Sequence, residues 1–324
     1  MPSTCALSRR HVVLAAASST ICSPRISRSL ALPAPLGVGI VAPGFLLPAE
    51  QYTSYAHLLS SFGLCAQVVP DRMSSLSQPA PIGARAAELL DAAETQARRS
   101  RLPPSAPLVL VGHSRGAKAC CVAASMSRRP VAALILLDPV DVTPFDSESV
   151  LQSLATAPVP TAVLGAARGA DCAPVGSNYE EFYTSLVRAD AMRLLGVLPS
   201  AGHMQFVDDR RSLGWDVCAV GKSPDAAVHD AAFAMIAAWV AVTLPARLAA
   251  ASSRDVAEVA AELEMQLAAQ DAVGQDAALQ LARAILAAEP QGELEEKRPG
   301  VACGQLRLAA QSHRYHNHVR WSCL

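Results

Sequence analysis

Residues 108–116, LVLVGHSRG, place a serine between two glycines directly after an apolar run, and an alanine-rich segment follows. Ser114 is the centre of the Gly-x-Ser-x-Gly pattern that it forms with Gly112 and Gly116. Between a strand and a helix, this pattern turns the chain sharply and exposes the serine hydroxyl. A base and nearby oxyanion donors can then make the hydroxyl an effective nucleophile. The stretch predicts a nucleophilic serine, with a plain structural turn as the alternative.

Two backbone amides are the expected oxyanion donors. The N–H of Arg115 follows the nucleophile at the start of the predicted helix, where the helix dipole favours an anion. The second donor should come from the loop after an earlier strand. In GIVAPGFLLP (39–48), Gly44 lets the backbone approach closely, so the N–H of Phe45 is the predicted second donor.

His203 is the predicted base. For a serine on this type of turn, the chain order is serine, acid, histidine. This order excludes the early histidines His11, His57 and His113. His203 lies in a glycine-containing loop after an apolar run, which would place its ring at the carboxyl edge of a sheet beside the serine. We interpret His229, inside an apolar helical segment, as structural, and His113 as a support of the turn.

Three aspartates compete for the role of the acid. Asp138 directly ends the apolar run AALILL, and Asp171 lies in the loop after the next such run. Asp141 follows closely in DPVD, and its position is also typical of a turn residue. Placement along the chain leaves Asp138 and Asp171 equally favoured, with Asp171 as the alternative acid.

These residues need a scaffold, and the hydrophobic pattern predicts one. From residue 36 onward, short runs of Val, Leu and Ile alternate with longer alanine-rich segments. Strands are expected at 37–41, 66–70, 108–112, 132–137, 161–165 and 192–198, and helices at 50–62, 84–98, 115–128, 178–190 and 224–243. Continuously apolar strands are typical of a sheet that is covered on both faces. The predicted fold class is therefore α/β, with a mostly parallel doubly wound sheet.

The chain divides into four predicted parts. Residues 1–34 are basic, rich in serine and free of acids, which is typical of a chloroplast transit peptide. A single domain follows over 35–245. Residues 246–290 form an amphipathic helical extension that packs on the domain or serves as a dimerisation or membrane-surface helix. Residues 291–324 are expected to be disordered, and their histidines, His313, His316 and His318, to be solvated.

Composition excludes some classes of partner. The 27 basic residues nearly balance the 28 acidic ones, so no net positive field attracts nucleic acid. Aromatic residues, at 4%, are too few for a base-stacking platform. The longest apolar run, 231–244, is shorter than the roughly 20 residues that a bilayer needs, so no transmembrane segment is expected. Nine cysteines without a Cys-x-x-Cys motif suggest reduced thiols, which fits the chloroplast stroma or, alternatively, the cytoplasm.

Four segments resemble the chlorophyllase family: GHSRGAK, LLDPVD, CAPVGSNYEEFY and AGHMQFVDD. Their order and approximate spacing agree with that family over residues 37–244. The resemblance implies an α/β-hydrolase fold and hydrolysis of the phytyl ester of chlorophyll to chlorophyllide and phytol. It also implies no metal or cofactor, and a small-molecule apolar ester, chlorophyll or a related pigment, as the partner. In that family the acid belongs to the DPVD segment, which favours Asp138 over Asp171.

The chain also departs from the family pattern. Ala117 replaces a usual glycine, Pro43 a histidine before the oxyanion-loop glycine, and Gln205 an acid after the His-Met pair. The sheet would begin at Gly37 without the two edge strands that normally precede the oxyanion loop. Two other functions therefore compete: a general carboxylesterase or lipase with the same triad, and a catalytically idle fold that binds pigment or lipid.

Overall fold

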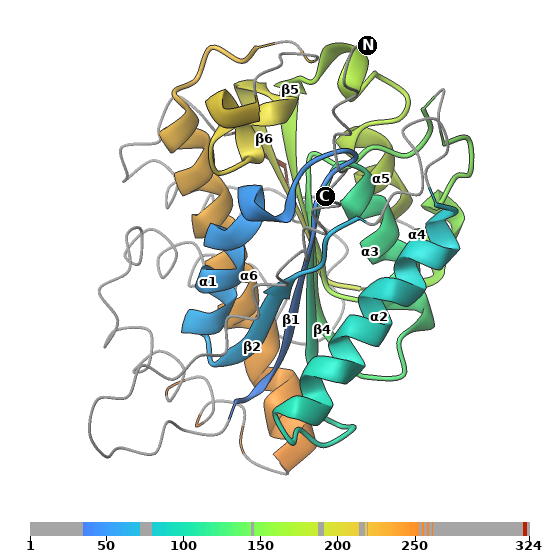
Figure 1. Cartoon of the computed structure of the whole chain (residues 1–324), viewed down its shortest axis with the longest axis vertical. Coiled ribbons are helices and arrows are strands. Elements are labelled where there is room, and N and C mark those ends of the chain that lie inside the picture. The colour runs from blue at the N-terminus through green and yellow to red at the C-terminus, as the bar shows by residue number, and fades with distance from the viewer. Residues whose placement is uncertain are drawn as a thin grey trace, which may run out of the picture.

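The computed structural model describes residues 35–71, 80–143, 146–186, 191–213, 218, 220–252, 255, 258, 261 and 320–322. These residues form a three-layer α/β arrangement with one central sheet (Figure 1). The predicted leader, most of the helical extension beyond residue 252 and the tail histidines lie outside the described residues.

The sheet has the order β2-β1-β3-β4-β5-β6-β7. Its strands are β1 (Gly37–Ala42), β2 (Leu64–Val68), β3 (Leu108–His113), β4 (Val131–Leu137), β5 (Thr161–Arg168), β6 (Arg193–Gly202) and β7 (Arg320–Ser322). The first six run parallel, and β7 pairs antiparallel with β6. Among the described residues, β2 forms one edge of the sheet, and the residues before Gly37 that could add strands beside it lie outside the described ranges.

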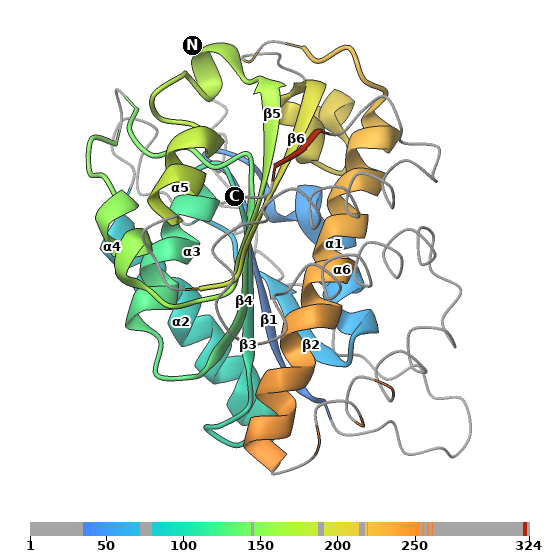
Figure 2. The same cartoon turned by 180° about the vertical axis from the view of Figure 1, so that it is seen from behind.

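Helices cover both faces of the sheet, as the continuously apolar strands predict. The helices are α1 (Thr53–Ser61), α2 (Ile82–Arg99), α3 (Arg115–Met126), α4 (Leu151–Thr156), α5 (Tyr179–Leu186) and α6 (Asp225–Ser252). Four short 3-10 helices are η1 (Ala49–Tyr52), η2 (Ala170–Cys172), η3 (His203–Phe206) and η4 (Arg210–Leu213). Helices α1 and α6 pack on one face, and α2, α3, α4 and α5 lie on the other (Figures 1 and 2).

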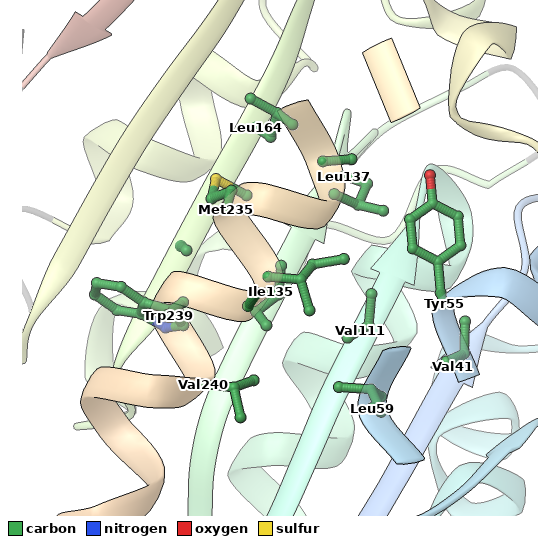
Figure 3. Packing of buried hydrophobic residues seen from close by; sticks show 14 of the residues in the cluster. Val41, Tyr55, Leu59, Val111, Ile135, Leu137, Leu164, Met235, Trp239 and Val240 are labelled. Atoms are coloured by element: carbon green, nitrogen blue, oxygen red, sulfur yellow. The ribbon is translucent and has the colours of Figure 1, made fainter. Parts of the chain in front are cut away.

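The core between α6 and the sheet supports the strands that carry the site. Met235, Trp239 and Val240 of α6 are fully buried and face Ile135 of β4 and Leu164 of β5 (Figure 3). Burial of a large apolar side chain contributes about 1.5–3 kcal/mol relative to exposure. This packing therefore fixes the positions of β4 and β5, whose carboxyl ends lie beside the candidate site.

Helix α6 is longer than predicted, because the sequence interpretation ended it near Pro245. A proline lacks the N–H that an interior helical residue donates, so it commonly marks a helix end. In the structure the helix passes through Pro245 and runs to Ser252. Leu244 and Ala249 are buried in the core, and their packing offsets the missing hydrogen bond. The boundary predicted at residue 245 therefore lies inside a core helix.

By length and composition alone, the segment Asp225–Ala250 could cross a membrane. Its most apolar window is, however, 72% buried inside the protein. Its apolar side chains cover the sheet, and we therefore interpret α6 as a core helix of the domain.

Two further differences concern segments with weak sequence patterns. The short helix α4 was not predicted, because six residues hold less than two turns of a helical pattern. Residues 320–322 lie in the tail for which disorder was expected, and in the structure they form β7 against Leu195, Gly196 and Val197 of β6. A three-residue strand owes its form to its partner strand, which the sequence does not indicate.

The expectation that all nine cysteines are reduced thiols is wrong. Cys172 in η2 and Cys218, in the loop before α6, form a disulfide with a Cα–Cα distance of 5.5 Å. Their separation of 46 residues follows no recognisable motif, and only the fold brings the two loops together. The thiols of Cys120 and Cys121 are free and buried, and the buried Cys65 accepts a hydrogen bond from Ser100 Oγ at 2.9 Å. The disulfide removes the support that reduced thiols lent to a stromal or cytoplasmic location.

We expect the double variant Cys172→Ser/Cys218→Ser to lower the free energy of unfolding by about 2–4 kcal/mol, because the disulfide restricts the unfolded chain. Thermal unfolding followed by circular dichroism should show a midpoint about 5–15 °C lower. A reductant should lower the midpoint of the parent protein and leave that of the double variant unchanged. Equal midpoints for parent and double variant would show that the disulfide does not stabilise the fold.

Candidate active site

The turn at Ser114 has the geometry that a nucleophilic serine requires. Strand β3 ends at His113, α3 begins at Arg115, and Ser114 between them adopts a positive φ of 54°. A Cβ atom at Gly116 would overlap the carbonyl oxygens of Ala42 and Pro43, and one at Gly112 would overlap the backbone of Ala117. Both glycines are therefore required by close packing. The sharp turn stores strain of about 1–3 kcal/mol and holds the serine at the end of the sheet.

Three predicted residues meet at this turn. His203 Nε2 lies 2.9 Å from Ser114 Oγ, and His203 Nδ1 lies 2.7 Å from Asp138 Oδ2. The exposed fractions of Ser114, His203 and Asp138 are 8%, 3% and 0%. The carboxylate accepts the Nδ1–H, so Nε2 is left with a lone pair toward the serine hydroxyl. This tautomer can accept the proton of Ser114, and the arrangement is that of a serine, histidine and aspartate triad.

Asp138 is held in place on its second oxygen as well. Its Oδ1 accepts a hydrogen bond from the Ala166 N–H at 2.9 Å, and its own N–H donates to Leu164 O at 2.7 Å. Asp138 follows β4 with a positive φ of 38°, which turns its side chain into the site. Strand β5 therefore fixes the carboxylate so that its remaining oxygen faces His203.

The other two aspartates lie elsewhere. Asp171 is exposed on η2, next to the disulfide-bonded Cys172, and the structure pairs His203 with Asp138. Asp141 accepts hydrogen bonds from Ser149 Oγ at 2.6 Å and from the Val150 N–H at 2.9 Å. It therefore organises the loop that leads into α4.

The two predicted oxyanion donors lie on segments that adjoin Ser114. The N–H of Arg115 belongs to the first residue of α3, and Phe45 follows Gly44 in the loop after β1. A Cβ atom at Gly44 would lie 3.2 Å from Ser114 Cβ, so a side chain there would crowd the serine. The loop therefore passes close to the nucleophile, as the sequence predicts, and Phe45 is its next residue.

The side chain of Arg115 has a structural use. Its guanidinium forms ion pairs with Asp71 at 3.1 Å and Asp146 at 3.0 Å, and it donates to Ala80 O. Asp146 also pairs with the buried Lys118 at 2.9 Å. These buried charges are paired, as burial demands. They connect two loops, the one between β2 and α2 and the one between β4 and α4, to the start of α3. The sequence showed no sign of this network.

The departures from the chlorophyllase pattern fit into this packing. Pro43 and Ala117 are buried around the two glycines of the turn. Gln205 Oε1 accepts from the Gly202 N–H at 2.9 Å, while Nε2 donates to Ser223 O at 2.7 Å and to Asp225 Oδ1 at 2.5 Å. A carboxylate at this position would have no hydrogens for the last two partners. Gln205 therefore connects the His203 loop to the start of α6.

The remaining histidines in this region are structural. His229 Nε2 lies 2.6 Å from Val207 O, which agrees with its interpretation as a structural residue. His113 is fully buried, with Nδ1 2.6 Å from the Tyr52 hydroxyl and Nε2 3.1 Å from His203 O. Sequence reasoning missed Tyr52, because η1 is distant in the chain and no motif marks it. Among the described residues no three His, Cys, Asp or Glu side chains gather as a metal site.

We expect His113 to make stability depend on pH. Burial, with the nearby His203 in a smaller role, lowers the pKa of His113 well below its usual value of 6.5. Below about pH 6.5 the unfolded chain binds a proton on His113 that the folded protein does not. The contribution of His113 is therefore complete above about pH 6.5, and stability is lost as the pH falls toward the folded pKa.

The measurement is urea unfolding of the parent and of His113→Gln between about pH 5 and 7.5. Below about pH 6.5, the free energy of unfolding of the parent should fall more steeply than that of the variant, by about 1.4 kcal/mol per pH unit. Parallel curves would show that His113 takes up its proton equally in the folded and unfolded states.

Comparison with known proteins identifies the family. The family model for chlorophyllase matches residues 17–275, which is most of the chain. The chain belongs to the chlorophyllase family. Membership makes it one of a family of hydrolases, and the matched range includes every candidate site residue. A comparison with curated proteins gives no match.

Solved structures of other proteins are similar to this chlorophyllase-family chain. A protein described as a dienelactone hydrolase from Klebsiella pneumoniae has a TM-score of 0.50 and 17% identity, covering 66% of this chain and 90% of that one. A sugar hydrolase from Lactococcus lactis has a TM-score of 0.47 and 15% identity, covering 74% and 92%. A ferulic acid esterase from Streptomyces cinnamoneus has a TM-score of 0.46 and 17% identity, covering 64% of this chain and 67% of that one. The first agrees with an α/β-hydrolase fold, the fold class predicted from the sequence.

Proposed function

We propose that the protein is a serine esterase that hydrolyses the phytyl ester of chlorophyll to chlorophyllide and phytol. The observation that carries the proposal is the hydrogen-bonded chain from Ser114 through His203 to Asp138, in a member of the chlorophyllase family. These three residues have the order, distances and burial that acyl transfer needs. The completeness of the triad argues against the idle, ligand-binding alternative.

The chemistry follows from the positions of the three side chains. Ser114 Oγ attacks the ester carbonyl carbon while His203 Nε2 takes the hydroxyl proton. The N–H groups of Phe45 and Arg115 stabilise the oxyanion of the tetrahedral intermediate. As the C–O bond to the alcohol breaks, His203 returns the proton and phytol leaves. Water then attacks the acyl-enzyme with the same base, which releases the chlorophyllide acid and restores Ser114.

Exposed apolar side chains support an apolar ester as substrate. Among the described residues, Leu46, Val175 and Val220 are exposed by 41%, 87% and 47%, and a fourth large apolar side chain, Met126, is exposed by 51% at the far end of α3. Leu46 follows β1, Val175 follows β5, and Val220 follows β6 and η4. All three therefore lie on loops beyond the carboxyl ends of parallel strands, where Ser114 also lies. Apolar side chains exposed on loops at the edge of the sheet that carries Ser114 support a phytyl ester over a small polar ester. They also support association with a membrane surface.

The test is incubation of residues 30–324 with purified chlorophyll a, with chlorophyllide followed by chromatography and a short-chain p-nitrophenyl ester assayed in parallel. We expect both esters to be cleaved. Cleavage of the short ester alone would leave a general carboxylesterase or lipase, the second candidate function. A folded protein that cleaves neither ester would favour the idle fold.

We further propose a chloroplast location, supported by the acid-free basic leader before Glu50. A fusion of residues 1–34 to a fluorescent protein tests it directly in plant cells. Import into chloroplasts supports the proposal, and fluorescence throughout the cytoplasm contradicts it.

A further inference from the structure

A buried hydrogen-bond chain links the predicted oxyanion loop to the loop of the base. The Gly44 N–H lies 3.2 Å from the Tyr52 hydroxyl, which lies 2.6 Å from His113 Nδ1. His113 Nε2 in turn lies 3.1 Å from the carbonyl oxygen of His203. Both Tyr52 and His113 have an exposed fraction of 0%. This hydrogen-bond chain therefore passes through the buried interior at His113, the residue that precedes Ser114.

Only one arrangement of hydrogens satisfies every contact. The carbonyl of His203 can only accept, so His113 must carry its hydrogen on Nε2. Burial lowers the pKa of His113 and raises that of Tyr52, so the ring is neutral and the phenol keeps its hydrogen. His113 Nδ1 then accepts the Tyr52 O–H, and the Tyr52 oxygen accepts the Gly44 N–H. The donor and the acceptor of each hydrogen bond in the chain are thereby determined.

The chain ends at the two parts of the site that must stay aligned with Ser114. Gly44 directly precedes Phe45, the predicted oxyanion donor, and His203 carries the proton. A Cβ atom at Gly44 would lie 3.1 Å from His113 Nδ1, so the imidazole also packs on this loop. The His113 and His203 rings have their centroids 4.7 Å apart. His113 therefore contacts the oxyanion loop and the base at once.

We propose that Tyr52 and His113 are positioning residues, which hold the oxyanion loop and His203 at a fixed distance from each other across Ser114. The inference rests on the proposed serine esterase function. A neutral His113 also places no second positive charge beside His203 when the base takes up the serine proton. Loss of the chain should lower the rate of acyl transfer, because transition-state contacts depend on alignment more than ground-state binding does.

Tyr52→Phe tests the inference, and Tyr55→Phe is its matched control. Both hydroxyls are buried on neighbouring turns, but Tyr55 donates to Phe206 O at 2.7 Å and has no bond to the oxyanion loop. With the short p-nitrophenyl ester, Tyr52→Phe should lower kcat by about 10- to 100-fold and change KM less than twofold. Tyr55→Phe should keep kcat within about twofold, with a similar loss in unfolding temperature.

A coupling measurement separates one connected chain from two independent contacts. We expect His113→Gln to lower kcat as well, and the addition of Tyr52→Phe to His113→Gln to lower it less than about threefold further, because the chain is already broken. Equal kcat for Tyr52→Phe and Tyr55→Phe would overturn the inference, as would multiplicative losses in the double variant. Esterase activity in the parent identifies such results as failures of this inference alone, whereas an inactive parent would overturn the proposed function with it.

Discussion

Ser114→Ala is expected to lower kcat for ester hydrolysis by about 10⁵- to 10⁶-fold. The hydroxyl oxygen is the atom that would form the acyl bond, and its proton is the one that His203 Nε2, at 2.9 Å, would accept. What remains should be the modest acceleration supplied by the oxyanion donors and by binding. The measurement is the initial rate with the short p-nitrophenyl ester, together with labelling by a fluorophosphonate probe.

Ser125→Ala provides the matched control. Ser125 lies on the same helix, α3, but it is exposed and donates to Val122 O. This variant should keep the kcat and the labelling of the parent. Residual hydrolysis by Ser114→Ala within tenfold of the parent would show that another group performs the reaction, and would remove the basis of the proposed mechanism.

Asp138→Asn should lower kcat by about 10⁴-fold with little change in KM. The reason lies in the two partners of the carboxylate. The Ala166 N–H needs an acceptor, so the amide oxygen of the variant would face Ala166 and the amide NH₂ would face His203 Nδ1. His203 would then carry its hydrogen on Nε2 and donate to Ser114, and in that tautomer it cannot act as the base.

Asp171→Asn separates the two candidate acids. Because Asp171 is exposed on η2, its variant should keep kcat within about twofold of the parent. The pair of variants assayed together gives a direct answer to the ambiguity that placement along the chain leaves. A large loss of kcat in Asp171→Asn, with Asp138→Asn active, would assign the acid to Asp171.

The departures from the family pattern leave the triad itself intact. Gln205 uses both ends of its amide, and the backbone of Pro43 packs against Gly116. Neither residue replaces a member of the triad.

Local sequence was sufficient for the parts of this protein that depend on neighbouring residues. The nucleophile turn could be predicted because Gly112, Ser114 and Gly116 lie within five positions, between an apolar strand and an alanine-rich helix. The six parallel strands could be predicted because buried strands are continuously apolar. His203 could be placed because it follows such a strand. Each of these patterns lies within one short segment of the sequence.

The remaining features were decided by contacts between distant segments. Asp138 and Asp171 both follow strands, and only the register of β4 and β5 directs Asp138 to His203. The bond between Tyr52 and His113 spans 61 residues, and the disulfide spans 46. No local pattern encodes such pairs, because their geometry is set by how helices and loops pack on the sheet. For the same reason Pro245 did not end α6, since burial of the following turn outweighed its local preference.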